Sequence, residues 1–322
     1  MKSKKNYYSK GQRRFEQLLS QENKETRDKW EKEQLELKKQ LIQTDQHNWS
    51  INDEEEENQN NGNENNNNNI NNINNINDNK EKLRYVGGVD ISFDQNDKDV
   101  GISGLVVCDI EKDFEIVYED YKLIKIEEPY IPSFLAFREV NPYVDLINIL
   151  KTKKPEYIPQ VILVDGNGIL HTRGFGIASH LGVLVDLPTI GCAKTVFALY
   201  EEGITKNYVG NIYYKYLRKF GDSYPLIGKS EVQWGYALRS TNEYDTPLII
   251  SIEHKVSNET ALEVVKMCCY YKEPEPIRLA DKITRRLIKA YQNFVEGFPY
   301  KEWDLKRYYN ENFDYIHNKL YD

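Results

Sequence analysis

The short, wholly apolar run Val161–Val164 (VILV) is the feature that most constrains how this chain can fold. A strand that is apolar at every position has no face for water, so it belongs in a sheet covered on both sides. Three longer runs precede it, at Leu83–Phe93, Val100–Ile110 and Phe114–Ile124. Their composition, with short polar breaks between them, predicts a meander of three strands.

Helical and strand segments alternate after that meander. We expect further strands near Thr189–Gly191 and over Leu248–Ile252. We expect helices over Ser133–Leu150, Gly176–Leu184, Glu259–Tyr270 and Ile277–Asn293. Strands first, then alternating helices and strands, indicate an α/β fold with a mixed sheet covered by helices.

The first 80 residues have a different composition. Residues 10–46 are rich in Glu, Lys, Gln and Arg, which suits a solvated helix. Of the 22 residues in 58–79, 15 are asparagine, so this tract buries too little apolar surface to offset the entropy of ordering. We therefore expect an N-terminal extension over 1–80 outside the chemistry, a folded domain over 81–300, and a tail over 301–322 of open role.

The charge balance excludes one class of nucleic-acid binder. The chain has 43 basic and 51 acidic side chains, a net charge of −8 and a pI near 5.4. Residues 1–80 hold 13 of the basic and 15 of the acidic side chains, which leaves 30 and 36 for the remainder. Binding driven by overall positive charge is typical of domains with a pI above about 9. A nucleic-acid partner must therefore meet a local basic strip or bound metal ions.

Membrane and disulfide classes are also disfavoured. No run of about 18 apolar residues predicts a membrane span, and Met1–Tyr8 has no apolar core of the kind that secretory signals carry. The four cysteines, Cys108, Cys192, Cys268 and Cys269, form no CxxC pair, which favours a reduced intracellular compartment.

Carboxylates follow two of the predicted strands. Asp90 follows Tyr85–Val89, and Asp165 follows Val161–Val164. An acid at the end of a buried strand is costly unless it is paired or binds a metal, although each could also cap a turn. Glu139, on the helix that begins near Phe134, is a third candidate. Three converging carboxylates would suit Mg²⁺, which activates water for phosphodiester hydrolysis.

A glycine-rich segment begins at Asp165. Residues 165–176 hold four glycines beside His171 and Arg173. Glycines allow close approach of the backbone to a ligand, but neither G-x-G-x-x-G nor GK[ST] is present, and a long turn is the alternative. His171 and His180 have no cysteine or carboxylate at a spacing that supports zinc.

Cationic side chains recur near one face of the last predicted helix. Both a solvated helix face and a strip that follows phosphates fit this spacing. The strip consists of Arg278, Lys282, Arg285, Arg286 and Lys289.

Four blocks of sequence resemble the endonuclease V family. Residues 129–139 (PYIPSFLAFRE) resemble its PYIPGFLxFRE motif, and residues 164–176 (VDGNGILHTRGFG) resemble VDGNGxxHPRxxG. Residues 178–194 (ASHLGVLVDLPTIGCAK) are similar to AxHLGVxxxxPTIGVAK, and residues 274–281 (PEPIRLAD) to the RxAD segment. The blocks span nearly the whole folded part in the right order.

This resemblance implies a ribonuclease H-like fold, a mixed five-stranded sheet between helices. It implies hydrolysis of a phosphodiester 3′ to inosine or deoxyinosine, typically the second bond, with Mg²⁺ or Mn²⁺. The metal carboxylates would be Asp90, Glu139 and Asp165. His254 falls where the family has an active-site histidine that positions water or steadies a phosphate oxygen.

The resemblance also implies how the base is held. A wedge that fills the gap left by the extruded base would be formed by Pro129, Tyr130, Ile131 and Pro132. The base pocket would be formed by Leu135, Gly166, Gly168, His171, Gly176, Ile177 and Ala193. Arg173 and Lys194 would contact phosphates.

Two departures from the family pattern set up the alternatives. Ser133 replaces the usual glycine after PYIP, and Ile252-Glu253 replaces a common Pro-Gly before His254. A catalytically silent binder of inosine-containing nucleic acid and a general structure-specific nuclease therefore stay open. The Asn-rich leader and reduced cysteines suggest a eukaryotic intracellular protein, and eukaryotic members favour RNA. We expect a monomer in the cytoplasm or nucleus, including the nucleolus, that acts on single-stranded RNA first and on DNA second.

Overall fold

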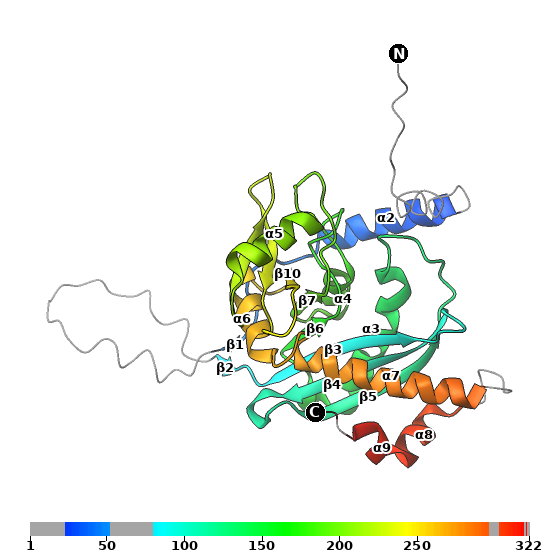
Figure 1. The fold of residues 1–322 in the computed structure, drawn as a ribbon. Helices are drawn as coiled ribbons and strands as arrows, with labels where there is room; N and C mark the ends of the chain where they lie inside the picture. The colour runs from blue at the N-terminus through cyan, green and yellow to red at the C-terminus, as the bar shows by residue number, and fades with distance from the viewer. Residues whose placement is uncertain (1–22, 52–79, 296–302, 319, 321–322) are drawn as a thin grey trace, which may run out of the picture.

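The protein, seen in a computed structural model that describes residues 23–51, 80–295, 303–318 and 320, is built on an eight-stranded mixed sheet (Figure 1). The strand order is β5-β4-β3-β6-β7-β10-β9-β8. β3 and β4, and β4 and β5, pair antiparallel, and β6 and β7 run parallel to β3. The strands are β3 Tyr85–Phe93, β4 Val100–Asp109, β5 Glu115–Lys125, β6 Val161–Val164, β7 Thr189–Ala193, β8 Ser223–Ile227, β9 Gln233–Leu238 and β10 Leu248–His254.

The predicted five-stranded sheet is present as β5-β4-β3-β6-β7, and β10, β9 and β8 extend it. Two of these additional strands escaped prediction because Pro225 interrupts β8 and Gly235 interrupts β9, and neither residue favours a strand. The core of the fold is therefore the expected ribonuclease H-like arrangement, widened at one edge.

Helices cover both faces of the sheet, as the apolar β6 requires. Ile162 and Val164 pack with α3 (Ala136–Lys153) and α4 (Ile177–Val185) on one face. On the other face, Val161 and Leu163 pack with α6 (Asn258–Cys268) and α7 (Glu275–Val295). The remaining elements of this part are the helix α5 Lys206–Tyr216 beside β8 and β9, and the 3-10 turns η2 Ile110–Lys112 and η3 Pro155–Tyr157.

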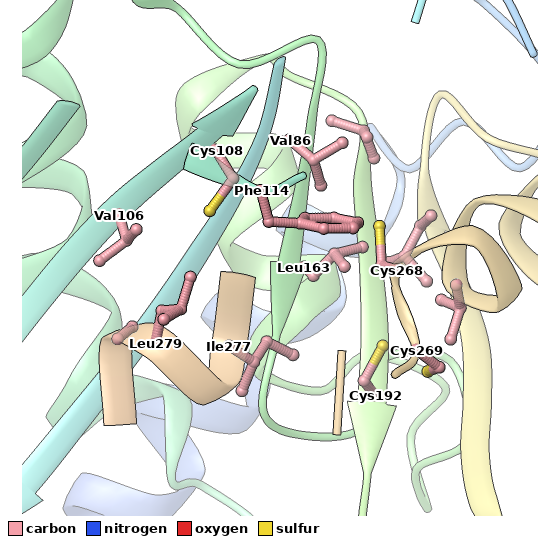
Figure 2. Close-up of a cluster of buried hydrophobic side chains, with 14 of the residues drawn as sticks. Val86, Val106, Cys108, Phe114, Leu163, Cys192, Cys268, Cys269, Ile277 and Leu279 are labelled. Carbon is pink, nitrogen blue, oxygen red and sulfur yellow. The ribbon is translucent and has the colours of Figure 1, made fainter. Parts of the chain in front are cut away.

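The four cysteines lie in the larger of these cores (Figure 2). Cys108, Cys192, Cys268 and Cys269 are all buried, and each thiol is free. Burial raises the pKa of each of these thiols, so they are held as neutral, apolar-like side chains. Among the described residues, no helix is long and apolar enough to cross a bilayer.

Two glycines let α7 lie against the sheet, as its path across β3 and β4 in Figure 1 shows. A Cβ atom on Gly88 would come within 2.2 Å of the carbonyl of Pro276, and one on Gly104 within 2.7 Å of Thr284. Close approach of backbone to backbone needs glycine at such positions. These two glycines therefore determine which residues of α7 lie against β3.

Part of the N-terminal extension packs onto the domain. The helix expected within residues 10–46 is present as α2 (Lys24–Lys38), but it is not simply solvated, because Trp30 and Gln34 are buried. β1 (Trp49–Ser50) pairs in parallel with β2 (Glu81–Lys82). The Asn-rich residues 58–79 lie outside the described residues.

The C-terminal residues also fold back. α8 (Leu305–Glu311) and α9 (Phe313–His317) lie beside α7 and β5. Trp303, Ile316 and Leu320 are buried in the larger core. Tyr309 donates a hydrogen bond from its hydroxyl to Glu119 of β5, so this tail is an integrated part of the fold.

Candidate active site

Two carboxylates meet at one end of the central strands. Val89 of β3 is paired with Val164 of β6 in a parallel register, so the next residues, Asp90 and Asp165, lie side by side. Asp90 is buried and Asp165 is partly exposed. The ends of parallel strands are where α/β proteins place ligands.

The helix α7 adds a third carboxylate and a hydroxyl. Thr284 donates a hydrogen bond from Oγ1 to Oδ2 of Asp90 over 2.8 Å. Asp281, one turn earlier on α7, is the charged group that raises the pKa of Asp90 most, after burial itself. The close helix–strand approach at Gly88 and Gly104 creates this contact.

The electrostatics show that these acids form one cluster. Burial raises the pKa of Asp90 to about 7, with repulsion from Asp281 and Asp165 adding to it. Burial likewise raises the pKa of Glu139 to about 8, and Asp90 and Asp165 add repulsion there. Carboxyl groups with raised pKa values, gathered in a cleft, are typical of functional sites.

Lys194 partly neutralises the cluster. Its Nζ lies 3.0 Å from Oδ2 of Asp165 and 3.1 Å from Oε2 of Glu273. Burial alone would lower the pKa of Lys194, but the two carboxylates outweigh it and raise the pKa. Asp90, Asp165, Lys194 and Asp281 line one open cleft of about 680 Å³.

The donor set fits a hard divalent cation. No trio of Asp, Glu, His or Cys side chains within the described ranges forms a ready three-ligand site, and the assignment of Asp90, Glu139 and Asp165 as metal ligands stays a prediction. Mg²⁺, however, is commonly held by one or two carboxylates with water and substrate phosphates completing its shell. A cation would relieve the repulsion that raises the pKa values of Asp90 and Glu139.

His254 is not part of this cluster. β10 runs antiparallel to β7, with His254 opposite Thr189, whereas Gly191 of β7 lies level with Val164. His254 is therefore at the far end of the strands from Asp165. Its Nε2 lies 3.3 Å from Asp186 and its Nδ1 accepts from the backbone of Ile42. The predicted role in positioning the attacking water does not fit this geometry.

The buried side chain of Glu253 on β10 contacts the glycine-rich segment. Its carboxylate accepts hydrogen bonds from the backbone N–H groups of Ile169 and Gly191, both over 2.9 Å. The hydroxyls of Ser179 and Ser251 donate two more. Burial raises the pKa of Glu253 to about 8. A Cβ atom on Gly168 would overlap this carboxylate. Glu253, which replaces the glycine common in the family, therefore fits because residue 168 is a glycine.

The wedge residues divide into an exposed tip and a buried base. The side chain of Tyr130 is 52% exposed, and Pro129 is exposed too, whereas Ile131 and Pro132 are buried. Ser133, the other departure, has a φ of 67°, in the region that favours glycine. Its carbonyl accepts from the ring of His171 over 2.9 Å and from Arg173 over 2.6 Å.

Only some of the predicted pocket residues keep an open surface. Leu135 is 42% exposed and Gly166 is partly exposed, with Ile177 packed close to Gly166. Ala193 is buried on β7 near the site. Three other predicted pocket residues in the glycine-rich segment are buried, namely Gly168, His171 and Gly176.

Arg173 is engaged by the chain itself. Its guanidinium lies 3.9 Å from the centroid of the Phe134 ring and donates to Gln34 of α2 as well as to Ser133. Lys38 of α2 donates to the carbonyl of Arg173 over 2.7 Å. Arg173 therefore joins the wedge to α2, whereas Lys194 is the predicted phosphate contact that faces the carboxylates.

Asp281, Thr284, Glu273 and Glu253 were not predicted as site residues. Asp281 lies in the RLAD segment that resembles the family, but the strand that it faces cannot be known without the fold. Thr284 and Glu273 look like ordinary helix and loop residues in the sequence.

The fold and the carboxylate cluster together define a ribonuclease H-like protein of the nuclease class. A family model described as Endonuclease V matches residues 67–282. The chain belongs to the endonuclease V family, whose members are nucleases acting on phosphodiester bonds.

Individual relatives agree with this assignment. The chain is 44% identical to mouse endonuclease V over 207 aligned residues. The aligned region is 64% of this chain but only 60% of the mouse protein. The chain is 44% identical to human endonuclease V over 72% of that protein. The crystal structure of the catalytic domain of human endonuclease V covers 84% of this chain and 98% of its own, with 37% identity and a TM-score of 0.70.

One similar structure contains nucleic acid. Ciona intestinalis endonuclease V was solved in complex with a 24mer DNA containing an inosine followed by a ribo-adenosine. It covers 83% of this chain and 99% of its own, at 32% identity and a TM-score of 0.68.

Proposed function

We propose that this protein is a metal-dependent endonuclease that hydrolyses a phosphodiester 3′ to inosine, typically the second bond, in single-stranded RNA. Deoxyinosine in DNA is the second substrate. The observation that carries the proposal is the cluster of Asp90 within β3, Asp165 directly after β6 and Asp281 on α7, which line one cleft. The Ciona relative, with inosine and a ribonucleotide in its bound strand, supports the substrate class.

A bound Mg²⁺ or Mn²⁺ would supply Lewis-acid activation of water and stabilisation of the leaving oxygen. Asp90 and Asp165, with Glu139 beside them, would hold it. Thr284 orients the Asp90 carboxylate through its 2.8 Å hydrogen bond. Lys194, whose Nζ is 3.0 Å from Oδ2 of Asp165, would meet a phosphate oxygen.

Base selection would use the glycine-rich segment. Hypoxanthine carries N1–H, a donor that adenine lacks. Oδ1 of Asn167 on this segment is buried without a hydrogen-bond partner. A buried acceptor without a partner is costly, and a donor from the ligand would satisfy it. The exposed ring of Tyr130 is suited to stacking in the gap that an extruded base leaves.

The two family departures do not argue for a silent binder. Glu253 and His254 lie on β10 away from the carboxylates. Glu253 accepts one hydrogen bond from Ile169 of the glycine-rich segment and three more from Ser179, Gly191 and Ser251. Ser133 keeps the glycine-like φ of the wedge. Both departures are thus accommodated without a change at Asp90, Glu139 or Asp165.

The test compares purified protein with Asp90→Ala on matched strands that contain inosine or adenosine at one position, with Mg²⁺, as RNA and as DNA. We expect cleavage 3′ to inosine alone, faster in RNA, and lost in Asp90→Ala. Cleavage of the adenosine strand at an equal rate would instead indicate a general nuclease. Selective binding without cleavage would indicate a silent binder. Action in the cytoplasm or nucleus as a monomer belongs to the same proposal.

A further inference from the structure

We propose that α7 and the C-terminal helices α8 and α9 form a second substrate groove, which binds the single strand of nucleic acid beyond the reacting phosphodiester. This deepens the proposed function and rests on it. The groove is named the tail groove here and consists of Arg285, Lys289, Asn293, Tyr308, Asn312 and Tyr315.

The tail groove adjoins the active-site cleft along α7. It has a volume of about 480 Å³, and Arg285 and Lys289 line both it and the cleft that holds Asp90 and Asp165. A strand whose phosphate reaches the carboxylates would therefore have an open path along α7. Figure 1 shows α8 and α9 lying along this helix.

The spacing on α7 suits an extended strand. Asp281, Arg285, Lys289 and Asn293 recur every four residues, so they lie along one face of the helix. Twelve residues of helix span about 18 Å, which is the length of several nucleotides. The cations follow the acid of the active site in order, as a strand leaving that site requires.

The structure divides the predicted basic strip by role. Three of its members hold the tail: Arg278 and Lys282 donate to the carbonyl of Leu320 over 2.9 and 3.0 Å, and Arg286 donates to the carbonyl of Ile316. The side chain of Arg285 is 67% exposed, although its Nε donates to Oδ1 of Asp281 over 2.6 Å, and Lys289 is also exposed. Arg286 also lines the tail groove, but it donates to Ile316. The predicted contact with phosphates is therefore assigned to Arg285 and Lys289.

The opposite wall supplies a surface for bases. Tyr315 on α9 is 64% exposed, and Tyr308 on α8 is steadied by the ring of Trp303, 5.4 Å away between centroids. Asn312 is fixed by a 2.9 Å hydrogen bond to the carbonyl of Tyr308. Cations that follow the backbone, combined with tyrosines on which bases stack, are the usual means of binding single strands.

The family-model match covers only the first turns of α7. The match to the family ends at residue 282, before Arg285, Lys289 and both C-terminal helices. The lining of the tail groove thus lies C-terminal to the part of the chain that the family model describes.

The test uses full-length protein in the Asp90→Ala background, so that strands stay intact during binding. Lys289→Glu, Tyr315→Ala and the two together are compared with Lys306→Glu, a charge reversal on exposed α8 that does not line the groove. Fluorescence anisotropy measures affinity for a short inosine strand spanning only the reacting bond, and for strands extended on either side. RNA and DNA versions are both run.

We expect the double variant to lose about 10-fold in affinity for a strand extended on one side, with the short strand and Lys306→Glu unaffected. Lys289→Glu should also lower the salt dependence of the logarithm of affinity by at least about 0.7. A loss in either RNA or DNA supports the groove. Equal affinities of the variants and the parent for every extended strand would overturn it. Binding does not need turnover, so absence of cleavage in the native enzyme would count against the proposed function alone.

Discussion

Thr284 donates from Oγ1 to Oδ2 of Asp90 over 2.8 Å, and the same hydroxyl lies 2.9 Å from Oγ of Ser92. The side chains of Thr284, Asp90 and Ser92 are all buried between α7 and β3. Among the described residues, the hydrogen bond from Thr284 is the one direct link between an α7 side chain and the Asp90 carboxylate, and it favours the ionised form of Asp90. The helix therefore tunes the carboxylate that we expect to bind metal.

Replacing Thr284 with valine keeps the shape and removes this donor. We expect the pKa of Asp90 to rise further, so the pH profile of cleavage should move to higher pH and the rate at neutral pH should fall by about 5- to 10-fold. Ser92→Ala is the matched control, because it removes only the neighbour of Thr284. An unchanged profile in Thr284→Val would mean that the hydrogen bond does not influence the acid.

Asp90 and Glu139 should make the metal-free protein less stable as pH rises. Their pKa values are about 7 and 8 in the folded chain, against 3.8 and 4.5 without burial. Between about pH 4 and 8 the folded state then binds more protons than the unfolded state, so the free energy of unfolding falls with rising pH. Thermal unfolding from pH 5 to 8 should show this decline. Asp90→Asn with Glu139→Gln should make it shallower and leave the contribution of Glu253, whose pKa burial also raises to about 8.

The same pKa values predict that metal displaces protons. Mg²⁺ must compete with protons on Asp90 and Glu139, so its affinity should increase by up to about tenfold per pH unit for each proton released, levelling off above about pH 8. Titration calorimetry in buffers of different ionisation enthalpy measures the released protons. A metal affinity that is constant from pH 6 to 8 would show that these two side chains are not ligands.

His254→Ala should leave catalysis nearly intact. The side chain lies at the end of β10 away from Asp165 and contacts Asp186 and Ile42. We expect cleavage within about threefold of wild type and a loss of about 1 kcal/mol in stability, whereas Asp165→Ala should lower the rate by at least about 100-fold. A loss in folded His254→Ala as large as that of Asp165→Ala would restore the catalytic role predicted from the sequence.

Glu253→Ala should destabilise the glycine-rich segment. It would leave the buried N–H groups of Ile169 and Gly191 without acceptors, at about 1–3 kcal/mol each. Chemical denaturation should therefore show a loss of about 3 kcal/mol. Glu263→Ala, which removes an exposed acid paired with Lys266, should cost less than about 0.5 kcal/mol. Equal effects of the two changes would contradict the anchoring role of Glu253.

The sequence predicts best where local pattern and burial agree. VILV at 161–164 forms the strand expected, and Asp90 and Asp165 are adjacent because parallel register follows from two apolar strands. Asp281 could not be placed beforehand, since its proximity to Asp90 depends on the close approach of α7 at Gly88 and Gly104. His254 was misplaced because a motif gives neighbours along the chain but not which end of an antiparallel strand it occupies.

Trp30→Ala should release α2 from the domain. The indole stacks on Phe137 with centroids 4.9 Å apart, beside Phe134, and it is only 7% exposed. Truncating a buried tryptophan costs about 3–5 kcal/mol, which exceeds what one 15-residue helix retains from its few remaining contacts. Amide hydrogen exchange should therefore accelerate throughout α2.

The same change should weaken the wedge, because Gln34 and Lys38 would no longer hold Arg173. Exchange should increase near Gly174, and cleavage of the inosine strand should slow. Leu35→Ala, on the same helix with 45% of the side chain exposed, is the control and should leave both measurements unchanged. Unaltered protection of α2 in Trp30→Ala would show that its attachment rests on Gln34 and Lys38, and that the stacked rings do not hold the wedge.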